Sequence, residues 1–272
     1  MLTPAQVEQY HEAGYVIPDF RLSDATLSRI KDAHSRLVEA HAEFTDYCPA
    51  VLPYAMEFLD FAQDEAILDM VTQLIGDNIA LWNSSFFAKP ALTGSRTPWH
   101  QDGEYWPMRP LATCTVWMAI DDATLENGCL EVIPGSHKDK RLRQHTTNDG
   151  PNLALNQALI PEELDSAKAA PLILEAGRIS LHDVYLVHGS EPNRSSKPRR
   201  GMTLRFMPTS SYYDRSIERE LYERAGKGSA VRPLFLMRGI DECGKNDYEN
   251  TGSNSSHEAI RGVAAAEWRR SK

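Results

Sequence analysis

The stretch TPWHQDGEYW, residues 97–106, places a histidine and an aspartate two positions apart among aromatic side chains. If this stretch is a strand or the end of one, the side chains of His100 and Asp102 point to the same face, because side chains alternate along a strand. A histidine and a carboxylate within apolar surface must either satisfy each other by hydrogen bonding or hold a ligand. The pair alone leaves both interpretations open.

The sequence on either side of this stretch predicts a β-rich core preceded by helices. Two early amphipathic segments follow N-cap residues, Thr3 and Ser23, and a third is ended by Gly76. From about residue 79, β-branched and aromatic runs alternate with Gly, Pro, Asn and Asp, which predicts six or more strands. The Asn-Gly pair at 127–128 predicts a tight hairpin turn. Strands that follow helices at this spacing favour a β-sandwich or barrel with helices packed outside.

Composition and charge narrow the class of protein. The chain of 272 residues carries 29 basic and 38 acidic side chains, a net charge of −9, which disfavours non-specific attraction to nucleic acid or to anionic lipid. No stretch has the roughly 18 apolar residues that span a bilayer. The polar N-terminal segment predicts no secretory signal, so we expect a cytoplasmic protein. Its four cysteines are widely spaced, which argues against a zinc ribbon or a disulfide framework.

A second candidate segment lies far downstream, where His188 ends a predicted apolar strand and precedes the flexible Gly189. Two imidazoles and one carboxylate on rigid strands make the facial triad that binds Fe(II) and leaves three coordination positions open. The absence of nearby thiolates argues against structural zinc. His182 adjoins Asp183, and neighbouring strand residues face opposite sides, so this pair is set aside. His145 and the other histidines fall on predicted helices or loops and are interpreted as surface residues.

Two longer stretches carry a family resemblance. They are WHQDGEYWPMRPLATCTVWMAIDDATLENGCLEVIPGSHK, residues 99–138, and HGSEPNRSSKPRRGMTLRF, residues 188–206. Three features agree: the WHQD element, the NGC-LEVIPGSHK segment, and the HGS element with an arginine eleven residues after its histidine. Over about residues 80–208 the sequence resembles the phytanoyl-CoA dioxygenase family of Fe(II)- and 2-oxoglutarate-dependent oxygenases. The IPGSHK element is interpreted as a turn of the fold, so His137 is left out of the site.

The resemblance implies a double-stranded β-helix, a cupin-like jelly roll, with a core over about residues 79–210. No repeat or low-complexity linker divides the sequence, so we expect one domain over residues 1–272. Its helices would occupy about residues 1–78. A loop and a closing helix would follow over about 211–272, of which 239–256 are rich in Gly, Asn, Ser and Asp and predicted to be irregular.

The resemblance also assigns the Fe(II) ligands, which are His100, Asp102 and His188. It implies that Arg199 pairs with the distal carboxylate of the cosubstrate 2-oxoglutarate, a role suited to the planar guanidinium. Arg194 and Arg200 are rival candidates for that role. Ser190 matches a helper hydroxyl, and Trp117 matches a tryptophan lining the cosubstrate pocket, although a turn residue and a core residue are the alternatives. The late strands with His188 and Arg199 would pair with the early strand of His100.

The implied reaction consumes O₂ and 2-oxoglutarate and releases succinate and CO₂ while one C–H bond of a substrate is hydroxylated. Related halogenases have a small residue in place of the carboxylate ligand, so the presence of Asp102 favours hydroxylation.

For the substrate, the sequence offers aromatic and cationic side chains near the expected metal: Tyr105, Trp106, Arg109 and Arg205. These favour a small polar metabolite such as an amino acid derivative, a betaine-like compound or an organophosphonate. The first three residues would otherwise pack the mouth of the barrel.

Three alternatives for function remain open at this point. An acyl-CoA or other lipid-like substrate would use basic runs at 138–145 and 197–200. A cupin-like protein would bind a ligand without turnover. A zinc hydrolase on a jelly roll would act without 2-oxoglutarate or O₂.

Overall fold

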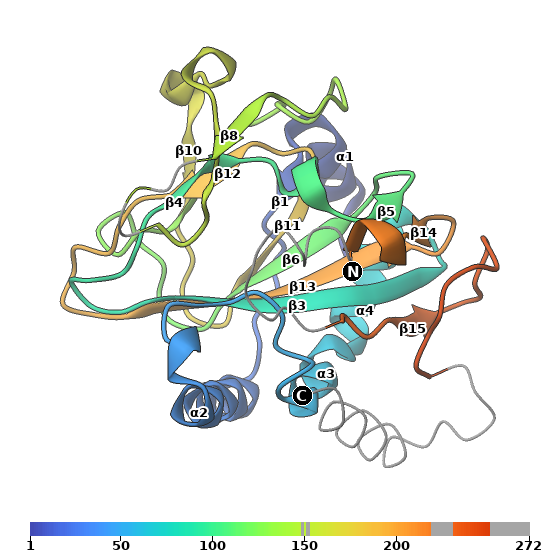
Figure 1. Cartoon of the computed structure of the whole chain (residues 1–272), viewed down its shortest axis with the longest axis horizontal. Helices are drawn as coiled ribbons and strands as arrows, with labels where there is room; N and C mark the ends of the chain where they lie inside the picture. Colours follow the sequence, from blue (N-terminus) through green and yellow to red (C-terminus); the bar gives the residue numbers. More distant parts are fainter. Residues whose placement is uncertain (148–149, 151–152, 219–230, 251–272) are drawn as a thin grey trace.

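Two antiparallel β-sheets form the core (Figure 1). The structure, a computed structural model, describes residues 1–147, 150, 153–218 and 231–250, without the side chain of Tyr105. The larger sheet consists, in spatial order, of β1 (Tyr15–Val16), β11 (Ile179–Asp183), β6 (Cys114–Ala119), β13 (Arg199–Pro208), β3 (Ile79–Lys89) and β15 (Phe235–Arg238), with β2 (Tyr47–Cys48) also paired to β3. The smaller sheet consists of β10 (Ala170–Leu172), β7 (Leu130–Val132), β12 (His188–Ser190) and β4 (Thr97–His100).

The order of strands along the chain makes the core a jelly roll. From β3 to β13 the chain passes back and forth between the two sheets, and β7 and β10 pair within the smaller one. The predicted fold class, mainly β with flanking helices in a double-stranded β-helix, is confirmed. Two further strand pairs lie outside the sheets: β5 (Met108–Arg109) with β14 (Tyr212–Tyr213), and β8 (His145–Thr147) with β9 (Gln157–Leu159).

The hairpin predicted at Asn127-Gly128 is wrong. The strands on either side, β6 and β7, belong to different sheets, so this turn carries the chain across the sandwich. Gly128 has a φ of 76°, which favours glycine, and the Asn127 side chain accepts from the backbone N–H of Thr124 at 2.8 Å and donates to the carbonyl of Asp122 at 2.8 Å. An Asn-Gly pair thus marks a tight turn without specifying that its flanking strands pair.

The predicted helices form with the predicted caps. The helices are α1 (Pro4–Ala13), α2 (Asp24–Ala40), α3 (Leu59–Ala62) and α4 (Glu65–Ile75). Thr3 and Ser23 accept hydrogen bonds from backbone N–H groups of the first turns of α1 and α2, and Asp64 does the same for α4. None of the helices in the described residues is long and apolar enough to cross a membrane.

The long strand β13 separates the apolar core from the functional side of the larger sheet. Its residues Met202, Leu204 and Phe206 pack in the main hydrophobic cluster with residues of α2 and α4, which cover the outer face (Figure 1). The alternate residues point into the sandwich. Burial of the apolar face therefore fixes the direction of the polar residues on β13.

Several predictions concern the ends of the chain. Residues 239–250 are irregular, as predicted, and Asn246 donates hydrogen bonds to the carbonyl of Ser211 and the carboxylate of Asp241. Residues 251–256 and the predicted closing helix lie outside the described residues.

Candidate functional site

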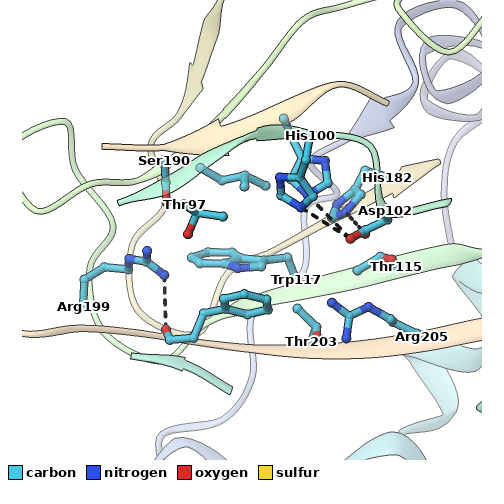
Figure 2. Close-up of a pocket in the computed structure, with 13 residues that line it drawn as sticks. Thr97, His100, Asp102, Thr115, Trp117, His182, Ser190, Arg199, Thr203 and Arg205 are labelled. Atoms are coloured by element: carbon cyan, nitrogen blue, oxygen red, sulfur yellow. Dashed lines mark hydrogen bonds and ion pairs between the residues drawn. The ribbon is translucent and has the colours of Figure 1, made fainter. Parts of the chain in front are cut away.

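The side chains of His100 and Asp102 (Figure 2) and of the distant His188 converge between the sheets. His100 ends β4, and His188 begins β12 directly opposite it in the strand pairing. Asp102 begins a short 3₁₀ turn, so it lies beyond the strand on which the sequence placed the pair. One nitrogen or oxygen atom from each side chain lies within 4.8 Å of the others, and all three side chains are buried. Asp102 Oδ1 is 3.6 Å from His100 Nε2 and 4.0 Å from His188 Nε2.

Backbone carbonyls fix the tautomer of both histidines. Nδ1 of His100 lies 2.8 Å from the carbonyl oxygen of Pro98, and Nδ1 of His188 lies 2.9 Å from that of Leu186. A carbonyl oxygen accepts and never donates, so each Nδ1 carries a hydrogen, and in the neutral ring the lone pair is then on Nε2. Both lone pairs then belong to the nitrogen atoms nearest Asp102. This is the arrangement in which imidazole binds a metal ion.

At neutral pH, the surroundings of His188 and Asp102 favour the protonation states in which these side chains can bind a metal ion. Burial, followed by the proximity of His100, lowers the pKa of His188 to about 3, so its ring is neutral. Burial alone would raise the pKa of Asp102. The combined effect of His188, His100, His182 and Arg205 outweighs burial and holds the pKa of Asp102 well below its usual range. A neutral imidazole at His188 and an ionised carboxylate at Asp102 result.

Gln101, between two members of the cluster, anchors the turn. Its side-chain NH₂ donates to the carbonyls of Arg141 and Tyr185 at 3.0 and 2.7 Å, and its side-chain oxygen accepts from the N–H of Arg143 at 2.7 Å. Its backbone N–H donates to Nε2 of His145 at 3.0 Å. The interpretation of His145 as a surface residue is therefore wrong, since its side chain is 1% exposed. No sequence motif identifies Gln101 or His145 as anchors.

His182 also lies at the cluster, although the sequence set it aside. Adjacent residues do face opposite sides, and His182 is the one that faces inward. Its Nε2 is 3.7 Å from Asp102 Oδ2, and its two ring nitrogens have no hydrogen-bond partner among the described residues. The signal that would have found it is the pairing of β11 with β6, which only the folded sheet provides.

A cavity that is open to solvent lies beside the cluster. It is lined by residues of both sheets: Phe87, Thr97, His100, Asp102, Thr115, Trp117, Leu130, His182, His188, Ser190, Arg199, Thr203 and Arg205. Gly201 makes room for one wall, because a Cβ there would lie 2.4 Å from the Trp117 ring. The three residues that the sequence associates with the cosubstrate, Arg199, Ser190 and Trp117, all line this cavity.

Arg199 approaches the cavity from the sheet that faces the histidines. β13 pairs with β3 and β6, so the expectation that it pairs with the strand of His100 is wrong. The guanidinium carbon lies 5.6 Å from the centre of the Trp117 ring, and Nη1 donates to the carbonyl of Phe87 at 3.3 Å. Nε has no hydrogen-bond partner within the described part of the chain. Burial lowers the pKa of Arg199 to about 10, which leaves it charged at neutral pH.

The rival arginines lie elsewhere. Arg200 points to the opposite face of β13, where it donates to both carboxylate oxygens of Asp121 at 2.7 and 2.8 Å. Arg194 is exposed. Neither residue lines the cavity.

Of the candidate substrate contacts, Arg205 lines the cavity and two others do not. Trp106 packs edge-on against Trp82, with ring centres 4.5 Å apart, in a separate hydrophobic cluster. Arg109 is exposed and donates to the carbonyls of Trp106 and Met108. Neither residue lines the cavity, so the structure gives neither a direct contact with a ligand bound there. The side chain of Tyr105 lies outside the described residues.

The residues present fit a divalent iron and a dicarboxylate. Two nitrogens and one oxygen on one side of a cavity are the donor set of a facial triad. The buried Nε of Arg199 is a donor that a carboxylate would satisfy.

Comparison with known proteins identifies relatives. A family model described as "Phytanoyl-CoA dioxygenase (PhyH)" matches residues 1–201. A "Phytanoyl-CoA dioxygenase domain-containing protein 1 homolog" of Dictyostelium discoideum is 33% identical over 153 residues, 56% of this chain and 54% of that protein. A "Probable alpha-ketoglutarate-dependent hypophosphite dioxygenase" of Stutzerimonas stutzeri is 32% identical over 139 residues, 51% of this chain and 48% of that protein. The matches span about half the length of these two relatives.

The fold has solved counterparts. The apo structure of the non-heme monooxygenase ThoJ aligns with a TM-score of 0.73 and 22% identity, covering 97% of this chain and 96% of that one. This likeness concerns the fold.

Proposed function

The chain belongs to the phytanoyl-CoA dioxygenase family, and we propose that it is an Fe(II)- and 2-oxoglutarate-dependent dioxygenase that hydroxylates a small polar metabolite. In the balanced reaction, R–H, 2-oxoglutarate and O₂ give R–OH, succinate and CO₂. The observation that carries the proposal is the meeting of two features in one cavity: the cluster of His100, Asp102 and His188, and the buried guanidinium of Arg199.

In this proposal His100, Asp102 and His188 hold Fe(II) through Nε2, a carboxylate oxygen and Nε2. Bound iron with 2-oxoglutarate would supply the oxidising chemistry. Arg199 receives the distal carboxylate of 2-oxoglutarate, Ser190 donates its hydroxyl to the same group, and Trp117 forms the wall beside it. These residues orient the cosubstrate and, with the buried surroundings, exclude water from the reacting atoms.

The lining of the cavity supports a small polar substrate over a lipid-like one. Thr115, Thr203 and His182 give its walls polar groups that a hydrocarbon chain would leave unsatisfied. The name of the hypophosphite dioxygenase relative also points to a small oxygen-rich substrate.

The test is a turnover assay with the full chain. Fe(II), 2-oxoglutarate and O₂ are supplied with a panel of amino acid derivatives, betaines and alkylphosphonates, and succinate is measured. We expect one class to stimulate succinate release, with hydroxylated product in equal amount, and the Asp102→Ala variant to be inactive. Turnover that persists without 2-oxoglutarate and O₂ would support a hydrolase instead. Tight binding of a panel compound without succinate release would support a binding protein.

A further inference from the structure

A row of polar side chains crosses the larger sheet on its cavity face. In the strand pairing, His182 on β11 lies opposite Thr115 on β6, and Thr115 lies opposite Arg205 on β13. All three line the cavity. Three neighbouring strands therefore present an imidazole, a hydroxyl and a guanidinium side by side, at the level of Asp102 (Figure 2).

This row is at the opposite end of the cavity from Arg199. Arg199 and Arg205 are six residues apart on one strand, which corresponds to about 20 Å of extended chain. In Figure 2 they flank the cavity, with Trp117 between them. The distal carboxylate bound by Arg199 is out of reach of Arg205, so the proposed contact with Arg199 leaves the second arginine without an assigned partner.

Four polar atoms of the row are buried without a hydrogen-bond partner in the described part of the chain. Nε of Arg205, Oγ1 of Thr115 and both ring nitrogens of His182 have no hydrogen bond within the part of the chain that the structure describes. Arg205 is 5% exposed, and no carboxylate of the described residues lies within ion-pair distance of it. Leaving one buried donor or acceptor unsatisfied costs about 1–3 kcal/mol. A ligand that accepts hydrogen bonds would remove this cost.

The guanidinium of Arg205 is held in place before any ligand arrives. It lies 5.0 Å from the centre of the Trp106 ring and 6.0 Å from that of Phe87, and it donates to the hydroxyl of Ser85. Stacking on aromatic rings orients the planar fork of an arginine. Trp106, although outside the cavity, thereby positions a residue that lines it.

The charged side chains that line the cavity, summed with iron and 2-oxoglutarate, have an excess of one positive charge. Among the described residues that line it, Asp102 is the carboxylate, and Arg199 and Arg205 are the cations. Under the proposed function, the positive charge of Fe(II) and the negative charge of the 2-oxoglutarate dianion cancel. One negative and two positive side chains then leave a net charge of about +1 in a buried site, which a monoanionic substrate would neutralise.

We propose that Arg205, with Thr115 and His182 beside it, recognises an anionic oxygen group of the substrate, a carboxylate or a phosphonate. This inference rests on the proposed function and narrows its substrate class to compounds that present an anionic oxygen group to Arg205, which a purely cationic compound lacks. The C–H bond to be hydroxylated then lies between that anionic group and the metal cluster.

Binding, without turnover, tests the inference. The full chain is loaded with Zn(II), which supports no oxidation, and with 2-oxoglutarate, and is titrated calorimetrically with methylphosphonate, propionate and tetramethylammonium. Arg205→Gln removes the charge, Arg205→Lys keeps it but loses the planar fork, and Arg194→Gln alters an exposed arginine as the control. Circular dichroism verifies that each variant is folded.

We expect the wild type and Arg194→Gln to bind at least one of the two anions and not the cation. Arg205→Gln should weaken that binding by about tenfold or more, and Arg205→Lys by less. Preference for methylphosphonate or for propionate distinguishes a phosphonate from a carboxylate substrate. Equal anion binding by wild type and Arg205→Gln, or no anion binding by a wild type that binds 2-oxoglutarate, overturns the inference alone. Failure of the wild type to bind 2-oxoglutarate contradicts the proposed function itself.

Discussion

The two sheets that enclose the cavity differ in how fully their polar side chains are satisfied. On the smaller sheet, the Nδ1 atoms of His100 and His188 are each bound to a backbone carbonyl. On the larger sheet, a set of cavity-lining side chains keeps polar atoms that have no partner in the described part of the structure: Thr115, His182, Arg199, Thr203 and Arg205.

This difference separates two kinds of preorganisation. The chain itself orients the proposed metal ligands, so their geometry does not depend on a bound molecule. The larger sheet holds donors whose partners must come from ligands, and it keeps them rigid by long strand pairing and aromatic packing. Substitutions on the two sheets should therefore have separable effects on metal binding and on binding of organic anions.

The largest effect is expected from the metal side. Asp102→Ala removes the carboxylate of the cluster, so Fe(II) binding and iron-dependent turnover should both be abolished, while the binding groups of the larger sheet remain. His100→Ala should have the same result. Metal competition titrations measure the affinity, and Asp139→Ala, which alters an exposed carboxylate, serves as the control. Iron binding by Asp102→Ala at wild-type affinity would remove the ligand assignment.

On the opposite sheet, Arg199→Ala should raise the apparent KM for 2-oxoglutarate by roughly a hundredfold, because truncating one partner of a buried charge pair typically costs 2–5 kcal/mol. Fe(II) affinity should stay near that of the wild type. Steady-state kinetics of succinate release, with Arg194→Ala as the matched control, measures the change. An unchanged KM for 2-oxoglutarate would show that another group binds the cosubstrate.

The turn between the two ligands tests whether the chain itself orients the metal side. Gln101→Leu leaves the carbonyls of Arg141 and Tyr185 and the N–H of Arg143 without their present partner. We expect a loss of about 2–4 kcal/mol in the free energy of unfolding, judged from the cost of unsatisfied buried groups, together with weaker Fe(II) binding. Urea denaturation and metal competition measure both. Gln144→Leu alters a neighbouring exposed side chain and serves as the control. We expect it to leave both the free energy of unfolding and the Fe(II) affinity nearly unchanged.

Lys89 joins the two sheets and gives a prediction for how the free energy of unfolding depends on pH. From β3 of the larger sheet, its Nζ donates to the carbonyls of Ser190 and Glu191, at 3.3 and 2.5 Å, at the end of β12 in the smaller sheet. Burial, followed by the charge of Arg199, lowers the pKa of Lys89 to about 6. In the unfolded chain its pKa is about 10.4.

The sign of the pH dependence follows from these two values. Between pH of about 6 and 10 the unfolded chain binds a proton that the folded chain has released, so stability due to this group rises with pH, by at most about 1.4 kcal/mol per pH unit. Denaturation of wild type and Lys89→Met at several pH values isolates the contribution. A wild-type advantage that shrinks as pH rises from 7 to 9 would contradict the lowered pKa.

Single helices and strands were predicted from the sequence more accurately than the way in which they are arranged. The strand-like pattern predicted from about residue 79 begins with β3 at Ile79, and the caps at Thr3 and Ser23 began helices where predicted. These features depend on local chemistry. The assignment of β13 to a sheet, and the crossing made by Asn127-Gly128, depend on which strands pair, which local patterns do not encode.

The same limit applied to the candidate site. His100 and Asp102 were found from their spacing, and they converge even though Asp102 lies on a turn. His182 was missed because its proximity to Asp102 follows from the strand pairing of β11 with β6. Trp106 and Arg109 were favoured for closeness in sequence to Asp102, but neither side chain lines the cavity.

The most direct test of the central claim is anaerobic titration of the apoprotein with Fe(II) and 2-oxoglutarate, followed by visible absorption. We expect a weak charge-transfer band that saturates with one iron and one 2-oxoglutarate per chain and bleaches when O₂ is admitted. In Arg199→Ala the band should appear only at a far higher concentration of 2-oxoglutarate. Iron binding by the wild type without such a band would contradict the claim that the two sheets bring a metal site and a cosubstrate site together in one cavity.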